Sequence, residues 1–239
     1  MTKYRIKATK TKDDLALLAR EVLIDYIKLG LAKKERFQIS LAGGSTPSTT
    51  YKLLAQINLP WNKVDVFLGD ERWVDESDEL SNSNMIKNSL LSIPPGKFSK
   101  FHPIVTTKYT SPQDSADNYH NYLEKFFNAS PPVFDLILLG LGDDGHTASL
   151  FPGSSSLKVV NKWATISEGM GLPRITLTSP VLSAAKKVIF MVSGSNKKQA
   201  LSRLLDPQEL SNRTPAKLVQ PNSEVLILAD NEAIASLEP

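Results

Sequence analysis

The stretch FDLILLGLGDDGHTASLFPG, residues 134–153, decides the fold that we expect for this chain. Residues 136–141 are apolar and uncharged and are interrupted only by Gly140. Such a run is typical of a strand that is buried on both faces of a parallel sheet. It ends abruptly in glycines, two aspartates and a histidine, so that a buried strand passes into a polar loop. In open α/β sheets, ligands bind at this carboxyl end of the strands.

The loop at residues 140–145, GLGDDG, also satisfies the G-x-G-x-x-G spacing of dinucleotide-binding sites. Two features argue against that interpretation. The carboxylates of Asp143 and Asp144 would lie beside a pyrophosphate, and Pro152 would break the helix that such a site requires. A tight turn is a simpler alternative, because Asp-Asp-Gly suits turns. From these residues alone, the turn and a functional loop both stay open.

The rest of the chain alternates apolar runs with segments of helical periodicity. Strands are expected at residues 4–8, 37–42, 64–69, 101–105, 163–166, 174–178, 187–193 and 224–229. Helices are expected at residues 13–29, where Gly30 marks the end, and then around 51–57, 81–91 and 112–127, in a segment that ends at 205, and from 231 onward. This alternation predicts an α/β fold with a mainly parallel, Rossmann-like sheet and helices on both faces. We find no repeat or compositional shift that would mark a linker.

Composition narrows the classes of function. The chain has 239 residues, of which 41% are hydrophobic, and this is enough for one substantial core. The net charge of +3 with scattered cations suits a small anionic substrate and argues against a nucleic-acid partner. The absence of cysteine excludes disulfides, thiolate zinc sites and cysteine nucleophiles. Neither a secretory leader nor a spanning apolar run is present, so we predict a cytoplasmic protein without a membrane partner.

Four of the expected buried strands end in polar clusters, namely GGSTP (43–47), DER (70–72), DDGH (143–146) and GSNKK (194–198). Because the carboxyl ends of parallel strands share one edge of a sheet, we expect these clusters to meet. GGSTP has the features of a phosphate cradle, since its glycines free backbone N–H groups, Thr46 can cap the next helix and Pro47 fits its first position. It lacks the spacing of a Walker loop, and an ordinary strand-to-helix turn is the alternative.

Cationic residues near the same edge are candidate phosphate ligands. Lys197 would act as a point charge and Arg72 as a bidentate fork. Arg174 opens a predicted strand and could reach the same edge. Taken singly, Lys197 or Arg72 is also typical of a solvated surface charge.

The chain contains three histidines, and their settings differ. His120 lies on an amphipathic helix and His102 precedes a proline in a short strand, and both settings favour structural roles. His146 follows the long buried strand, with carboxylates two and three residues before it. This position suits a general base that is held and tuned by an acid, for which Asp144 is a candidate.

Other catalytic motifs are missing from the sequence. There is no G-x-S-x-G elbow, so Ser45, Ser149 and Ser195 lack the setting of a serine nucleophile. There is no H-E-x-x-H or other dense ligand pattern. We therefore predict that the protein uses neither a metal nor a cofactor.

Taken together, the clusters resemble those of the 6-phosphogluconolactonases. The resemblance runs from residue 37 to residue 228 through GGSTP, GDER followed by Ser81-Asn82, GLGDDGHTASLFPG, RITLT and GSNKK, in that order. DGHTASLFPG is highly specific to the family, whereas GGSTP is shared more widely. The resemblance implies one domain over residues 1–239, with a fold similar to that of glucosamine-6-phosphate deaminase and ribose-5-phosphate isomerase.

The resemblance also implies a reaction, the hydrolysis of 6-phospho-D-glucono-1,5-lactone to 6-phosphogluconate in the oxidative pentose phosphate pathway. His146 would activate water and Asp144 would orient His146. The residues implied in substrate binding are Gly43, Gly44, Ser45, Thr46, Asp70, Glu71, Arg72, Arg174 and Lys197. The implied partner is the small phosphorylated lactone, and the oligomeric state is not predicted. A δ-lactone is an activated ester, so a positioned water, a base and oxyanion stabilisation are sufficient.

Two alternatives come from the same fold. Glucosamine-6-phosphate deaminases share GSTP and DGH, but they carry a glutamate before the proline, where this chain has Phe151, and a tyrosine where it has Arg72. A non-catalytic sugar-phosphate sensor usually accompanies a DNA-binding segment. None of the 36 residues before the first matching strand resembles a helix-turn-helix, and His146 would then have no role.

Overall fold

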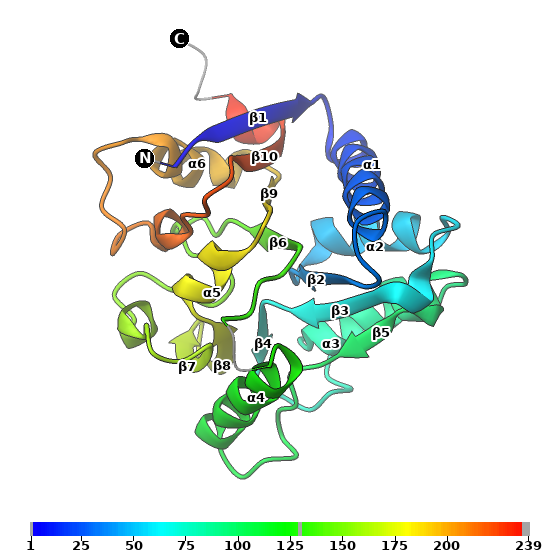
Figure 1. The fold of residues 1–239 in the computed structure, drawn as a ribbon. Coiled ribbons are helices and arrows are strands. Elements are labelled where there is room, and N and C mark those ends of the chain that lie inside the picture. The colour runs from blue at the N-terminus through cyan, green and yellow to red at the C-terminus, as the bar shows by residue number, and fades with distance from the viewer. Residues whose placement is uncertain (1, 129–130, 236–239) are drawn as a thin grey trace.

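The structure is a computed structural model that describes residues 2–128 and 131–235. Its main feature is a parallel sheet with the strand order β1-β10-β9-β6-β2-β3-β5 (Figure 1). In that order the strands are β1 (Tyr4–Thr9), β10 (Val225–Asp230), β9 (Val188–Val192), β6 (Leu136–Gly140), β2 (Phe37–Leu41), β3 (Val64–Leu68) and β5 (Lys100–His102). All of these strands pair in parallel. The prediction of a mainly parallel α/β fold is confirmed.

Helices connect the strands. The α-helices are α1 (Lys12–Leu31), α2 (Ser45–Ala55), α3 (Asn82–Ile86), α4 (Pro112–Phe126), α5 (Ser179–Ala184), α6 (Lys198–Leu205) and α7 (Asn231–Ile234). A π-helical turn, η2 (Lys87–Leu91), continues α3, and short 3-10 turns occur at η1 (Trp61–Lys63), η3 (Gly96–Phe98), η4 (Ser155–Lys158), η5 (Ser195–Lys197) and η6 (Pro215–Leu218). Within the described residues, no helix is both long and apolar enough to cross a bilayer.

Side chains on β2 and β3 show that helices cover both faces of the parallel sheet. Phe37 on β2 packs under α1, where a Cβ at Gly30 would lie 2.3 Å from its ring. Phe67 on the neighbouring strand points to the other face and packs edge-on against Phe126 of α4, with ring centroids 5.1 Å apart. Successive side chains of a strand alternate between faces, so α1 and α4 lie on opposite sides (Figure 1). Gly30 therefore does not end α1, which continues to Leu31, and its role is to admit Phe37.

The start of α2 differs from the expectation for GGSTP. The helix begins at Ser45, and Gly44 is its N-cap with a φ of +106°. Thr46 is therefore not the cap, and Pro47 occupies the third helical position. The reason lies in the backbone of Gly44. Glycine adopts a positive φ without strain, and this turn of the chain lets the helix begin at Ser45, before the expected cap. Proline is tolerated in this first turn because its missing N–H has no intrahelical partner there.

A second, antiparallel sheet was not expected from the sequence. Its order is β4 (Asp70–Arg72), β8 (Leu172–Leu177) and β7 (Ala164–Gly169). The DER cluster is therefore itself a strand, separated from the end of β3 by Gly69. It pairs with β8, with Asp70 opposite Thr176 and Arg72 opposite Arg174. Three residues are too few to show an alternating pattern, and the partner strand is distant in sequence. The small sheet extends the carboxyl edge of the large one.

Candidate active site

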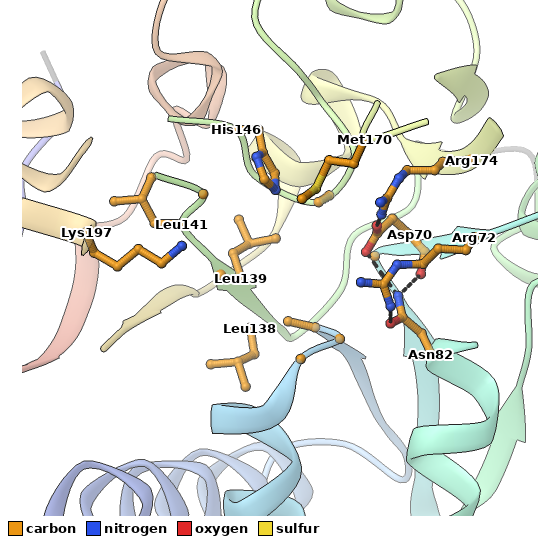
Figure 2. Close-up of a pocket in the computed structure, with 17 residues that line it drawn as sticks. Asp70, Arg72, Asn82, Leu138, Leu139, Leu141, His146, Met170, Arg174 and Lys197 are labelled. Carbon is orange, nitrogen blue, oxygen red and sulfur yellow. Dashed lines mark hydrogen bonds and ion pairs between the residues drawn. The ribbon is translucent and has the colours of Figure 1, made fainter. Parts of the chain in front are cut away.

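A cavity of about 280 Å³ opens at the carboxyl ends of β2, β3, β6 and β9 (Figure 2). These four strands are consecutive neighbours in the sheet. The cavity is lined by residues from each of the four strand-end clusters and from the small sheet, namely Gly43, Gly44, Gly69, Asp70, Arg72, Asn82, Gly142, His146, Met170, Arg174 and Lys197, together with apolar residues of β6. The predicted meeting of the four clusters is confirmed.

His146 and Asp144 form a hydrogen-bonded pair in the loop after β6. Asp144 Oδ1 accepts from His146 Nδ1 at 2.6 Å and from the His146 backbone N–H at 2.9 Å. Within the described residues, no hydrogen bond is formed at Nε2. Because an ionised carboxylate can only accept, Nδ1 carries the proton, and Nε2 of the neutral ring is left as an acceptor that faces the cavity. The pair is thus arranged as a general base with an orienting acid.

The glycines that imitate a nucleotide pattern serve this loop. Gly142 N–H donates to the His146 carbonyl at 2.8 Å, and Gly145 N–H donates to the Gly142 carbonyl at 3.0 Å. Gly145 has a φ of +93°, and a Cβ at Gly142 would lie 2.1 Å from His146 Nδ1. The loop is therefore a tight turn as well as a functional loop, and its glycines let the imidazole lie against the backbone.

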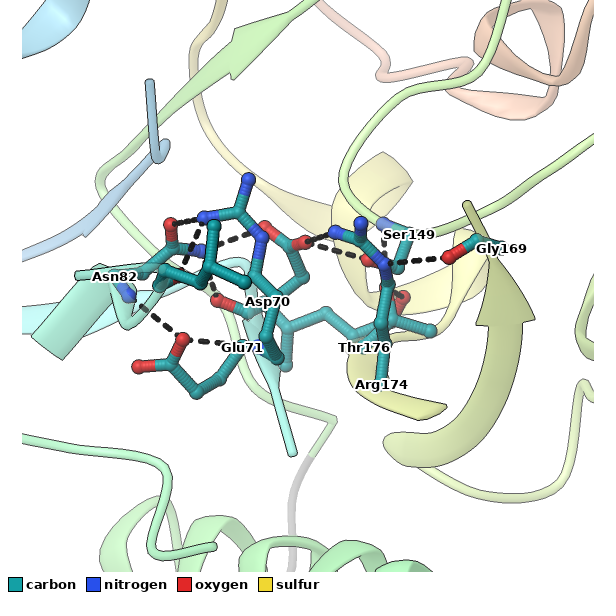
Figure 3. A network of polar contacts seen from close by, with 10 residues as sticks. Asp70, Glu71, Asn82, Ser149, Gly169, Arg174 and Thr176 are labelled. Carbon is teal, nitrogen blue, oxygen red and sulfur yellow. Dashed lines mark hydrogen bonds and ion pairs between the residues drawn. The ribbon is translucent and has the colours of Figure 1, made fainter. Parts of the chain in front are cut away.

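Asp70 lies at the centre of a buried polar network (Figure 3), to one side of His146 in the cavity view of Figure 2. Ser149 Oγ donates to Asp70 Oδ2 at 2.5 Å, and Asn82 Nδ2 donates to the Asp70 carbonyl at 2.8 Å. Arg174 Nη1 lies 3.9 Å from Asp70 Oδ2. Burial lowers the pKa of the Arg174 guanidinium, and the Asp70 charge opposes this effect. Guanidinium groups stay charged in proteins, so Arg174 is a cation in the cavity wall.

Two arginines from the small sheet face the cavity together. Arg72 and Arg174 are register partners on β4 and β8. Arg72 Nη1 donates to Asn82 Oδ1 at 2.5 Å and to the Leu80 carbonyl at 2.9 Å, so its fork is held in place. In Figure 2, Lys197 lies on one side of His146 and the two arginines lie on the other. The cavity therefore offers three cationic side chains beside one carboxylate, Asp70, which favours an anionic ligand.

Glu71 is not brought to the cavity, although the sequence suggested a place near the ligand. Its carboxylate accepts from the backbone N–H groups of Asn82 and Ser83, both at 2.7 Å, at the start of α3. The reason is strand alternation, because Asp70 and Arg72 face the cavity and the residue between them faces away. Burial raises the pKa of Glu71, against the lowering effect of these hydrogen bonds. Glu71 supports α3, whose N-cap Ser81 accepts from Asn84 N–H through its side chain.

Ser45 and Thr46 line a neighbouring cavity of about 550 Å³ instead of the central one. Gly43 and Gly44 line the central cavity, and Lys197 lines both. GGSTP thus spans the boundary between the two spaces. The early start of α2 is the cause, since it turns the serine and threonine away along the first turn of the helix.

Sequence reasoning missed Met170 as a lining residue. It lies at the tip of the β7–β8 hairpin, is 78% exposed and has a φ of +57°, and Gly171 follows with a φ of +78°. Two positive φ values in succession are typical of a two-residue hairpin turn. The signal was the Gly-Met-Gly sequence between two predicted strands. In the described part of the chain, no group of three or more His, Cys, Asp or Glu residues could hold a metal ion.

Comparisons with known proteins agree with this geometry. The family model for glucosamine-6-phosphate isomerases/6-phosphogluconolactonase matches residues 10–228. A 6-phosphogluconolactonase from Nostoc sp. is 40% identical over 230 residues, which cover 94% of this chain and 95% of the relative.

Solved structures extend the likeness. The structure of 6-phosphogluconolactonase from Trypanosoma brucei superposes with a TM-score of 0.87 at 28% identity and covers 100% of both chains. A monomeric glucosamine-6-phosphate deaminase has a TM-score of 0.80 at 20% identity, covers 97% of this chain and 99% of its own, and shares the fold. The chain belongs to the glucosamine-6-phosphate isomerase/6-phosphogluconolactonase family.

Proposed function

We propose that this chain hydrolyses 6-phospho-D-glucono-1,5-lactone to 6-phosphogluconate, as a single domain of residues 1–239 acting in the oxidative pentose phosphate pathway. One observation carries the proposal. His146 is fixed at Nδ1 by Asp144, and Nε2 is open to a cavity with three cationic side chains. Relatives that cover nearly the whole chain are named 6-phosphogluconolactonase, which supports the same reaction.

The proposed chemistry is general-base hydrolysis. His146 Nε2 removes a proton from a water molecule as the water oxygen attacks C1 of the lactone. The carbonyl electrons move to oxygen, and the resulting tetrahedral oxyanion collapses with cleavage of the bond between C1 and the ring oxygen. The imidazolium returns its proton to that oxygen, which becomes a hydroxyl group, while the carboxylic acid product ionises. Asp144 orients the ring and balances its transient charge, and base assistance contributes about 10²–10⁴-fold.

Substrate binding is assigned by charge. Arg72, Arg174 and Lys197, together with the N–H groups of Gly43 and Gly44, surround the phosphorylated sugar. These cations also oppose the negative charge of the oxyanion. Asp70 accepts hydrogen bonds from substrate hydroxyls. Ser45 and Thr46 reach the substrate only from the neighbouring cavity, and Glu71 acts indirectly by holding Arg72 and Asn82.

Neither a deaminase nor a non-catalytic sensor is supported by the residues at the site. Phe151, which occupies the position of the deaminase glutamate, has its ring centroid 4.5 Å from that of His146 and offers no acid–base group. A sensor would not need an imidazole nitrogen held open to the cavity. The cytoplasmic location and the absence of nucleic-acid and membrane partners stay predictions.

The direct test is turnover by the purified protein. Freshly prepared phosphorylated lactone is followed by ³¹P and ¹H NMR, with the spontaneous hydrolysis rate subtracted. We expect rapid conversion at catalytic protein concentration and a much lower kcat/KM for the unphosphorylated lactone. A rate no greater than the spontaneous one would refute the proposed reaction. Equal use of both lactones would refute phosphate recognition alone.

A further inference from the structure

Phe151 is a buried aromatic residue that lies just outside the cavity lining and contacts two of its functional side chains. Its ring centroid is 4.5 Å from that of His146, with the two planes inclined at 42°. The guanidinium carbon of Arg174 lies 5.3 Å from the same centroid. Phe151 is 6% exposed, so its ring has little freedom to move. One side chain thus lies against both the base and a substrate-binding cation.

Gly169, at the end of β7, packs against the Phe151 ring, as His146 and Arg174 do. A Cβ at Gly169 would lie 2.3 to 2.5 Å from three atoms of this ring. Its φ lies outside the left-handed region, so any residue could adopt the backbone conformation there, and only the ring requires glycine. The Gly169 carbonyl also accepts from Arg174 Nε at 3.2 Å (Figure 3). The hairpin backbone therefore holds Phe151 and Arg174 at the same point.

The Asp144 contact by itself leaves one motion of His146 free. A hydrogen bond from Nδ1 restrains that atom, but coupled changes of χ1 and χ2 can still rotate the ring plane while the contact is kept. Rotation would carry Nε2 away from the bound water, and a displacement of about 1 Å can cost about 10²-fold in rate. A flat, immobile neighbour against the imidazole removes this rotation.

We propose that Phe151 is a positioning residue that sets the plane of the His146 imidazole, and that Gly169 holds Phe151 in place. This inference rests on the proposed role of His146 as the base. Phe151 does not touch the substrate, so it acts only through His146 and Arg174. Because Arg174 keeps its hydrogen bond to Gly169 and its ion pair with Asp70 without the ring, loss of the ring should lower kcat more than it raises KM.

Two variants and a matched control test the inference. Phe151→Leu removes the ring but keeps a large apolar side chain, whereas Gly169→Ala keeps the ring and displaces it. Gly171→Ala is the control on the same hairpin, because an added Cβ there meets nothing within 4 Å and only strains a φ of +78°. Thermal melting of each variant establishes that the folded protein is measured.

Kinetics and NMR supply separate readouts. We expect Phe151→Leu and Gly169→Ala to lower kcat by about tenfold or more while KM changes by less than about threefold. The imidazole protons of His146 lie in the ring current of Phe151, so their resonances should shift in both variants. With three histidines in the chain, His146→Gln identifies these resonances. Gly171→Ala should change neither kcat nor the His146 resonances.

The outcomes separate this inference from the proposed function. Normal kcat in Phe151→Leu, or unmoved His146 resonances in either test variant, would overturn the positioning role. An equal loss of kcat in Gly171→Ala would assign the effect to the hairpin backbone instead of the ring. A parent protein without lactone turnover would refute the proposed function, while the scalar couplings of the His146 Cβ protons, which report χ1 and not the ring current, would still decide whether Phe151 orients His146.

Discussion

Two aspartate–histidine pairs are formed in the parallel part of the fold, one in the loop after β6 and the other between β3 and β5. The open pair, Asp144 and His146, follows β6 with an Nδ1···Oδ1 distance of 2.6 Å, and its side chains are 45% and 21% exposed. The closed pair, Asp65 and His102, lies on β3 and β5 with an Nε2···Oδ1 distance of 3.1 Å, and its side chains are 1% and 2% exposed. The residue types are the same, so the surroundings must explain different roles.

The closed pair is fully engaged. His102 Nδ1 is hydrogen-bonded to the Tyr122 hydroxyl, and its ring stacks on Phe67 with centroids 4.3 Å apart. Arg36 donates two hydrogen bonds to Asp65, at 2.7 and 2.8 Å. No nitrogen of this histidine is left for a substrate. Only the open pair is therefore arranged to act as a base, because its second nitrogen has no hydrogen-bond partner among the described residues and faces a cavity.

The largest expected effect comes from replacing the histidine of each pair, His146 or His102, by glutamine in separate variants. His146→Gln should lower kcat by about 10²–10⁴-fold with little change in KM or melting temperature, because a base acts in the transition state and this side chain is partly exposed. His102→Gln should lower the melting temperature and leave kcat per folded molecule unchanged. Steady-state kinetics and calorimetry on both variants measure this. A His146→Gln enzyme with near-normal turnover would remove His146 from the mechanism.

Removing the buried acid of the closed pair is the next test. Asp65→Asn should destabilise the fold by about 3 kcal/mol, because it removes the charge from a buried carboxylate that accepts hydrogen bonds from Arg36, Gln38 and His102. For a chain of this length, that corresponds to a melting temperature lower by about 6–12 °C. Urea unfolding at pH 7 measures the free energy, and Asp144→Asn serves as the matched exchange in the open pair. Equal stability of Asp65→Asn and the parent would show that the closed pair contributes nothing to the fold.

The pKa of Asp65 predicts how the stability difference between the parent and Asp65→Asn depends on pH. Burial by itself would raise the pKa of Asp65, but hydrogen bonds from His102, Arg36 and Gln38 and the charge of Arg36 together lower it well below its ordinary value. A lowered pKa gives stability that is fully present above the unfolded value, about 3.9, and is lost as the pH falls towards the folded value. The difference in unfolding free energy between the parent and Asp65→Asn should therefore be constant from pH 7 to 5 and shrink below about pH 4. A difference that stays constant down to pH 3 would contradict this assignment.

The acid of the open pair should matter for rate and not for stability. Asp144→Asn should lower kcat by about 10²-fold, since an amide cannot balance the imidazolium or enforce its orientation. Asp143→Asn is the matched control, because Asp143 accepts from the Asp144 backbone N–H and does not contact the His146 ring. Kinetic measurement of both variants separates the two neighbouring acids. Comparable losses in the two would mean that the overall charge of the loop, and not the Nδ1 contact, supports catalysis.

The sequence predicted those parts of the site that depend on local pattern. The uncharged run before Gly140 marks a buried strand, and a parallel sheet brings the ends of four such strands to one edge, so the neighbourhood of His146, Asp70 and Lys197 was predictable. The local sequence also predicted structural roles for the other two histidines. The buried contacts of His102 in the closed pair agree with that prediction. His120, on α4, accepts a hydrogen bond from the Trp163 backbone N–H at 3.3 Å.

Features that depend on pairing between distant segments were not predictable. Which way Glu71 faces is set by β4, and β4 exists only because β8 pairs with it. Gly169 looks like an ordinary loop glycine until the Phe151 ring is seen against it. Ser45 and Thr46 moved to a neighbouring cavity because one positive φ at Gly44 started α2 early. In each case a single residue carries no periodic signal, and the outcome is decided by tertiary contacts.

The smallest expected effect comes from replacing one lysine near each pair by alanine. Lys197→Ala removes a cation that lines the central cavity and should raise KM by about tenfold for the phosphorylated lactone, as expected for one charge-assisted contact. Lys34→Ala is the matched control near the closed pair, where Lys34 Nζ lies 2.7 Å from Asp135, and it should leave KM unchanged while slightly lowering stability. Measuring both variants with phosphorylated and unphosphorylated lactone isolates the phosphate contribution, because only the phosphorylated substrate should lose affinity in Lys197→Ala. An equal rise in KM for both lactones would place Lys197 beside the sugar ring instead of the phosphate, and no change for either would exclude Lys197 from substrate binding.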